Sequence, residues 1–213
     1  MKRIVATVIC LAIIFSCNSP YTPKPRAYFK IDLPEHQYKA FDQAGYPYSF
    51  EYPVYAEVSK DTTLFDDNPD NPYWINIDFP QFHGRIYVSY KTIGGRSVYK
   101  VKTENGYKDS MVVNSFEGLR EEAFKMTFKH TLKASSIDDS LFTTAKGISG
   151  VYFSVGGNAA TGNQFFLTDS TKHFLRGALY FDASPNSDSL QPVNDFLRED
   201  LKHLINSFSW KKN

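Results

Sequence analysis

Two alternating segments joined by a short turn constrain the fold of this 213-residue chain more than any other feature. Apolar side chains occupy every second position in both segments: Ile75, Ile77 and Phe79 in 74–79, and Ile86, Val88 and Tyr90 in 85–91. A period of two is typical of a β-strand with one buried face. The intervening PQFHG has a suitable length for a hairpin loop. The sequence therefore predicts an antiparallel hairpin with one face in the core.

A second hairpin is predicted in GNQFFLTDSTKHFLRGALYF (162–181), where two apolar runs flank the polar cluster Asp169–His173. Phe165 and Leu167 share one face of the first run, and Leu175, Gly177, Leu179 and Phe181 share one face of the second. Gly177 in mid-strand indicates a close backbone approach, such as a crossing helix. A further strand is expected in YPYSFEYP (46–53), which Pro53 ends.

Two helices interrupt the strands. The first is expected over 114–133, with Asn114 as its cap and Glu117 completing a capping box. The second is expected over about 190–208, with Pro192 in its first turn. The order strands, helix, strands, helix without βαβ alternation predicts an α+β fold, in which helices pack on an antiparallel β-sheet.

The N-terminus has the pattern of a secretory signal. Lys2 and Arg3 precede an apolar run over 4–16, which is too short to span a bilayer as a helix. Ser16 before Cys17 favours a bacterial lipoprotein signal peptide at 1–16 with the lipid on Cys17. The alternative is an ordinary signal peptide in which Cys17 is incidental. The predicted domains are this signal, a lipid-anchored Pro-rich tether at 17–44, and a single α+β domain at 45–213.

Composition narrows the function classes. The chain has a net charge of +1 and no basic tract, so nucleic acid is not an expected partner. Its five histidines are scattered and only two cysteines occur, which predicts no metal site. The glycine-rich GGNAATG lacks the Lys-Ser/Thr of a phosphate-binding loop, and no cofactor is predicted.

The polar cluster of the second hairpin allows two interpretations. Asp169, Ser170 and His173 supply the residue types of a serine hydrolase, but no G-x-S-x-G motif surrounds the serine. Asp and Ser are also favoured in turns, because their side chains bond nearby backbone N–H groups. The turn interpretation is preferred. A separate stripe of Lys125, Lys129 and Lys133 along the first helix is read as a solvated face, with a binding surface as the alternative.

Several longer segments carry a family resemblance: YTPKPRAYFKIDLP (21–34), YPYSFEYPVYA (46–56), WINIDFPQFHGRIYVSYK (74–91), KHTLKASSI (129–137), and 162–181 followed by PNSDSLQPV. Together they resemble the gliding motility lipoprotein GldD family. Ala27 and Thr161 are small departures from the expected pattern. The resemblance implies a lipoprotein required for gliding and linked to type IX secretion, without a catalytic motif. FEYP and the closing INSFSW are also similar to Mog1/PsbP-like domains.

Three functional hypotheses follow. The first is a non-enzymatic assembly or stabilising component of the gliding and type IX secretion machinery. It is anchored in the membrane by its N-terminal lipid, and its hairpin tip of Asp169, Ser170, Lys172 and His173, with Arg176, binds another envelope protein. No acidic residue follows Cys17 in Asn18–Pro20, which favours the periplasmic face of the outer membrane. The second is a periplasmic ligand-binding module for glycan that uses Trp74, and the third is a hydrolase using Ser170 and His173.

Overall fold

The computed structural model describes residues 30–61, 72–104 and 106–211. The predicted signal peptide and the lipid-attachment residue Cys17 lie outside the described residues. One compact unit runs from Leu33 to Asn213 and contains the helices and strands described below. It therefore includes residues 33–44, which the sequence assigns to the tether.

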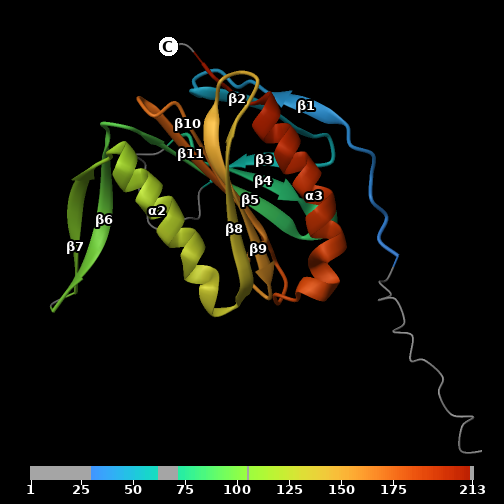
Figure 1. Cartoon of the computed structure of the whole chain (residues 1–213). Helices are drawn as coiled ribbons and strands as arrows, with labels where there is room; N and C mark the ends of the chain where they lie inside the picture. Colours follow the sequence, from blue (N-terminus) through green and yellow to red (C-terminus); the bar gives the residue numbers. More distant parts are fainter. Residues whose placement is uncertain (1–29, 62–71, 105, 212–213) are drawn as a thin grey trace, which may run out of the picture. The chain divides into compact units, whose positions relative to one another are not determined.

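A seven-stranded sheet forms the centre of this unit, in the order β3-β4-β5-β11-β10-β9-β8 with antiparallel neighbours throughout (Figure 1). Its strands are β3 (Glu57–Lys60), β4 (Ile75–Phe79), β5 (Gly84–Thr92), β8 (Ala134–Thr143), β9 (Ser149–Gly157), β10 (Asn163–Thr168) and β11 (His173–Phe181). The predicted hairpins are confirmed as β4–β5 and β10–β11. A 3-10 turn, η1 (Pro80–Phe82), joins the first pair.

Two smaller antiparallel sheets accompany the central one. The first has the order β1-β2-β12 and combines β1 (Tyr38–Phe41) and β2 (Tyr48–Pro53) with β12 (Ser209–Trp210) from the other end of the chain. The second is a hairpin of β6 (Arg96–Thr103) and β7 (Gly106–Val113), which lies beside α2 and extends away from the central sheet (Figure 1).

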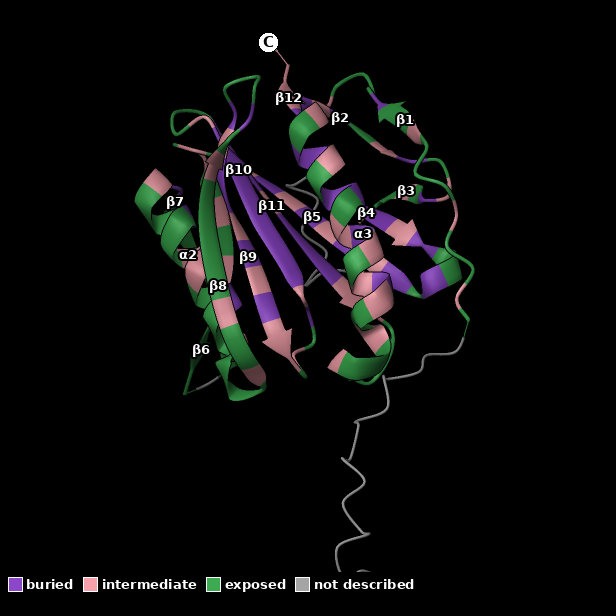
Figure 2. Ribbon diagram, turned by 45° about the vertical axis from the view of Figure 1, so that its right-hand side comes forward, coloured by how far each residue is buried: buried purple, intermediate pink, exposed green. Residues whose placement is uncertain are grey.

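The two faces of the central sheet are covered by different helices. Side chains alternate along each strand, so Phe165 and Leu167 face away from Phe166. Phe165 and Leu167 are fully buried on the face of α3 (Ser187–Ser207), whose Leu197 and Leu201 are equally inaccessible. Figure 2 shows α3 in front of this face, with its buried side turned to the sheet.

The opposite face carries α2 (Phe116–Phe128), which continues as the 3-10 turn η2 (Lys129–Leu132). Leu119 and Ala123 of α2 pack in one cluster with four side chains of the sheet: Val151, Phe153, Phe166 and Phe174. These four come from β9, β10 and β11. Helix α2 thus packs on one part of this face, while β4 and β5 border an open groove.

The helix ends differ from the sequence-based expectations. Ser115 rather than Asn114 caps α2, since its Oγ accepts a hydrogen bond from the backbone N–H of Gly118 at 3.1 Å. The amide of Asn114 is occupied elsewhere, where its Oδ1 accepts from Ser97 Oγ at 2.8 Å. Helix α3 begins at Ser187 with Asn186 as its cap, so Pro192 lies inside the helix instead of in its first turn.

Gly177 meets an aromatic ring and not a helix. It pairs across the strands with Phe165, and a Cβ on Gly177 would lie 2.4 Å from Cζ of Phe165. The expected close approach is therefore present, but a cross-strand side chain causes it. The absence of a side chain at Gly177 makes room for the Phe165 ring in the core under α3.

Candidate functional site: a groove beside helix α2

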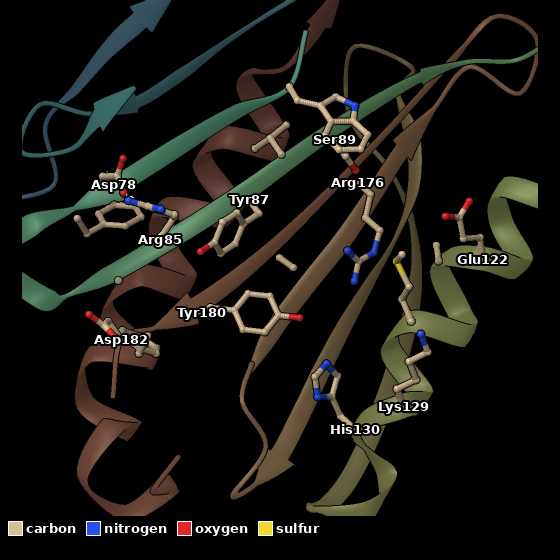
Figure 3. Close-up of a pocket in the computed structure, with 18 of the residues that line it drawn as sticks. Asp78, Arg85, Tyr87, Ser89, Glu122, Lys129, His130, Arg176, Tyr180 and Asp182 are labelled. Atoms are coloured by element: carbon tan, nitrogen blue, oxygen red, sulfur yellow. Dashed lines mark hydrogen bonds and ion pairs between the residues drawn. The ribbon is translucent and has the colours of Figure 1, made fainter. Parts of the chain in front are cut away.

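A groove of about 1160 Å³ lies between α2–η2 and the uncovered part of the central sheet. Side chains from β3, β4, β5 and β11 line its sheet side, and side chains from α2 and η2 line the other. Figure 3 shows Arg176 and Tyr180 of β11 and His130 of η2 pointing into the space between the two walls. Residues far apart in the sequence thus share one surface.

The polar half of β5 forms the floor of this groove. Arg85, Tyr87, Ser89 and Lys91 line it, and they alternate with the buried Ile86, Val88 and Tyr90. The alternation that places three apolar side chains in the core under α3 therefore also places four hydrogen-bonding side chains on the opposite face.

Ion pairs lie at two places along the groove. Nζ of Lys91 lies 2.9 Å from Oε2 of Glu122 on α2 and donates to the hydroxyl of Tyr99 on β6, also at 2.9 Å. This contact joins β5, α2 and the β6–β7 hairpin. Nε of Arg85 on β5 pairs with Asp78 on β4. These four charged groups of the groove are already neutralised by protein partners.

Arg176 on β11 is a further charged group of the groove lining. Its Nη2 donates to Oε1 of Gln164, which also accepts from Thr127 Oγ1 at 3.1 Å. Within the described ranges, Arg176 forms no ion pair with a carboxylate. Burial lowers the pKa of the Arg176 guanidinium, while Tyr180 and the charge on Glu122 act in the opposite direction. A guanidinium remains charged in proteins, so the groove contains a partly buried cation that has no ion-pair partner among the described residues.

His130 adds a titratable group next to this cation. Burial lowers the pKa of His130, and the positive charge on Arg176 lowers it further. Both effects favour the neutral form of the ring. Ser89 makes no hydrogen bond to His130 in the part of the chain that the structure describes. The arrangement provides a cation and hydrogen-bonding groups around an open space, which is suited to binding.

The tip of the β10–β11 hairpin is a hydrogen-bonded turn. Oδ1 of Asp169 accepts from the backbone N–H groups of Thr171, Lys172 and His173, at 3.0, 2.8 and 2.8 Å. Partial burial opposes ionisation of Asp169, but these three donors hold its pKa below the ordinary value. Ser170 adopts a left-handed conformation with φ of 62°. Asp169, predicted as a hydrolase or partner-binding residue, thus stabilises the backbone of its own turn.

The five residues predicted to bind a partner do not share one surface. Ser170 and Lys172 are exposed at the tip and Asp169 is half-buried, whereas His173 is only 5% exposed. Its Nδ1 lies 2.6 Å from the hydroxyl of Tyr90, and its ring stacks on Trp210 with centroids 4.8 Å apart. Arg176 lies in the groove. Whether the exposed part of the tip binds a partner stays a prediction.

A catalytic triad is not assembled at this tip. His173 is bonded to Tyr90, Asp169 accepts from backbone N–H groups, and the described contacts include no hydrogen bond from Ser170 Oγ to His173. Nucleophile, base and orienting acid are therefore not connected as a hydrolase requires.

Trp74, the residue proposed to stack on a glycan, lines the groove and is half-buried. Its Nε1–H donates to the backbone oxygen of Tyr90 at 2.8 Å. The indole is thus fixed in orientation by the sheet. Of the lysine stripe, all three members are exposed and Lys129 lines the groove.

The sequence analysis missed one buried polar cluster around Asp200 of α3. Asp200 accepts hydrogen bonds from Nδ1 of His36 at 2.7 Å, from the hydroxyl of Tyr38 at 3.1 Å, and from the hydroxyl of Tyr55. Burial, with the nearby charge on Asp200, raises the pKa of Tyr38 to about 12. The one signal for this cluster in the sequence was an acidic residue, Asp200, at a position of α3 that faces inward.

Two general features complete the description. Neither long helix in the described ranges combines the length and apolar character needed to cross a membrane. No group of three or more His, Cys, Asp or Glu side chains among the described residues could hold a metal ion.

Comparison with known proteins identifies the family. The sequence profile of the gliding motility lipoprotein GldD family matches residues 18–210. The chain belongs to this family, and membership implies involvement in gliding motility and a lipid-anchored position in the cell envelope. No curated protein matches the chain by sequence.

Among solved structures, the chain is similar to the solution structure of cyanobacterial PsbP (CyanoP) from Synechocystis sp. PCC 6803. The two are 10% identical, with a TM-score of 0.42, over 84% of this chain and 95% of the other. The match agrees with the expected PsbP-like likeness, but a TM-score this low supports no argument about function. The antiparallel α+β class is confirmed by the strands and helices themselves.

Proposed function

We propose that this protein is a non-enzymatic component that assembles or stabilises the gliding and type IX secretion machinery. It holds a folded domain on a lipid-anchored tether at the periplasmic face of the outer membrane. There it binds other envelope proteins of that machinery. Membership of the GldD family supports the link to motility, and the absence of acidic residues in Asn18–Pro20 supports the choice of membrane.

The observation that carries the proposal is the exposed apolar face of the β6–β7 hairpin. Tyr107, Met111 and Val113 occupy alternate positions of β7 and are 72%, 62% and 60% exposed. Val98 pairs with Met111 across the strands and adds to the same face. An apolar group of this kind outside the core marks a site of protein contact.

The other face of the hairpin is fixed to the domain. Tyr99 pairs with Ser110 and therefore points away from Met111, toward Lys91 and Glu122. A two-stranded hairpin alone is marginally stable in water. Attachment on one face and apolar exposure on the other are what a docking element requires.

The experiment is complementation of a gene deletion with Tyr107→Thr, Met111→Thr and Val113→Thr combined. Threonine retains strand propensity while it removes apolar area. We expect normal protein abundance with loss of spreading and of type IX secretion. The matched control changes three exposed residues on the opposite face of the same hairpin, Val101, Lys108 and Val112, to Thr and is expected to behave as wild type.

A photo-crosslinking residue at position 107 tests the contact directly in cells. We expect it to trap an envelope protein, and the same residue at exposed position 141 of β8 provides the control. Normal spreading of the triple variant, at normal abundance and without a crosslink from position 107, would contradict the proposed role of the hairpin.

A second candidate function is binding of a periplasmic glycan, which the position of Trp74 in the groove favours. Aromatic faces provide stacking surfaces, and the Nε1 contact to Tyr90 holds this one in place. Titration with soluble cell-wall fragments should then quench tryptophan fluorescence. Trp74→Phe should abolish that quenching, while Trp210→Phe should retain it.

A further inference from the structure

Two cations of the groove lining, Arg176 and Lys129, have no ion-pair partner among the described residues, and Arg176 is the more buried of the two. Arg85 is neutralised by Asp78 and Lys91 by Glu122, whereas Arg176 contacts the neutral groups Gln164 and Tyr180. A guanidinium has five N–H donors in a planar fork. These neighbours leave several of the donors without an acceptor from the described residues.

The groups around Arg176 can complete a site for an anion. Tyr180 and His130 point toward the same space in Figure 3, and each carries a hydrogen-bonding group. Lys129 lies on the η2 side of the same groove. A carboxylate matches the fork of arginine with two parallel hydrogen bonds, so it suits this geometry.

The rest of the groove lining is suited to a peptide segment and not only to a small ion. Met126 and the largely buried Leu119 and Ala123 of α2 line the groove together with Tyr87 and Ala178 of the sheet. The volume of about 1160 Å³ exceeds the range of roughly 300–1000 Å³ that is usual for small-molecule pockets. An extended segment of several residues can place one carboxylate at Arg176 and its apolar side chains along α2.

We propose that the groove binds a peptide segment of a partner protein, and that an Asp or Glu of this segment pairs with Arg176. This inference deepens the proposed function and rests on it, because it gives the chemistry of one contact between this protein and another envelope protein. The contact is separate from the apolar face of the β6–β7 hairpin.

The test uses the purified mature protein, from which normal processing has removed the predicted signal peptide at 1–16. The probes are acetyl-Ala-Leu-Asp-Leu-Ala-amide, the same peptide with Asn in place of Asp, and sodium acetate at equal ionic strength. Binding is followed by NMR through the side-chain Nε–H of Arg176. We expect saturable binding of the Asp peptide, about tenfold tighter than that of the Asn peptide, since a charged acceptor strengthens the hydrogen bonds.

Variants assign the preference to Arg176. Arg176→Gln should reduce the Asp-over-Asn preference to about one, measured by peptide fluorescence anisotropy. Because Arg176 also supports Gln164, a second pair of variants leaves that contact intact: Met126→Glu places a competing carboxylate in the groove, and Met126→Gln is its matched control. We expect weaker binding of the Asp peptide for Met126→Glu only.

Three results would overturn the inference. Equal affinity for the Asp and Asn peptides would exclude a role for the carboxylate. An unchanged preference in both Arg176→Gln and Met126→Glu would place binding elsewhere. Acetate binding as tightly as the Asp peptide would indicate a site for free small carboxylates. None of these results affects the hairpin complementation test, so failure of the groove and failure of the proposed function are distinguishable.

Discussion

Nδ1 of His36, just before β1, lies 2.7 Å from Oδ1 of Asp200 in α3. This contact joins the segment where the domain begins to its last helix, across 164 positions of the chain. His36 also stacks on Phe196, one turn earlier in α3, with centroids 4.3 Å apart. The entry of the chain into the folded unit is therefore held by polar and aromatic contacts to one helix.

Asp200→Ala should destabilise the domain by about 1–3 kcal/mol, because it leaves the half-buried hydroxyls of Tyr38 and Tyr55 without their acceptor. Urea denaturation measures the change in the free energy of unfolding. Hydrogen exchange should show faster exchange in Tyr38–Phe41 than in β11. The control, Glu199→Gln, removes an exposed pair with Lys202 and should change stability by less than about 0.5 kcal/mol.

Asp169→Ala should cost about 1–2 kcal/mol, because three backbone N–H groups of the turn lose one shared acceptor. Asp169→Asn retains an acceptor oxygen and should lose less. The lowered pKa of Asp169 means that its stabilisation is present above the unfolded value near 3.8 and is lost as the pH falls below it. Denaturation at pH 7 and pH 3 should show a smaller Asp169→Ala effect at pH 3.

His173 should make the domain less stable in mild acid. Burial lowers its pKa, with Lys172 adding to the effect and Asp169 opposing it, so the unfolded state binds more protons below about pH 6.5. Stability is therefore lost as the pH falls from 6.5 toward the lowered value. His173→Phe should flatten the stability profile between pH 7.5 and 5.5, and an unchanged slope would contradict this assignment. His130 shifts in the same direction, so the difference between variant and wild type is the quantity to compare.

Gly177→Ala should destabilise the domain by about 1–3 kcal/mol, because the new methyl group would overlap the buried ring of Phe165. Phe165→Leu should reduce this cost in the double variant. A double-mutant cycle measured by urea denaturation gives the coupling energy. Additive effects of the two substitutions would show that the ring is not the cause.

The strands with one buried face were predictable from sequence, and the exposed strands were not. β5 alternates because the core lies on one side of it, whereas β10–β11 were recognisable as two apolar runs, since side chains on both of their faces are buried. β6–β7 has exposed apolar residues on both faces, such as Met111 on one and Val112 on the other, so no contrast between faces marks it. The sequence pair Asn105-Gly106 between the two strands was the signal that could have indicated a hairpin.

The groove could not be predicted, because its charged residues come from separate elements. Arg85, Glu122 and Arg176 lie on β5, α2 and β11, and no spacing in the sequence relates them. Sequence reasoning did select Arg176, but as part of the hairpin tip. Strand alternation places its side chain on the face of α2, opposite to that of His173.

The pairing of Ser209 and Trp210 with β2 has a consequence for the biogenesis of this protein. The sheet β1-β2-β12 is complete only when a segment some 160 positions after β2 has arrived. A chain that crosses a membrane N-terminus first must therefore reach the other side almost entirely before this sheet closes. Until then Tyr48 and Phe208 lack each other as packing partners, and the lipid attachment site emerges long before the domain it carries is folded.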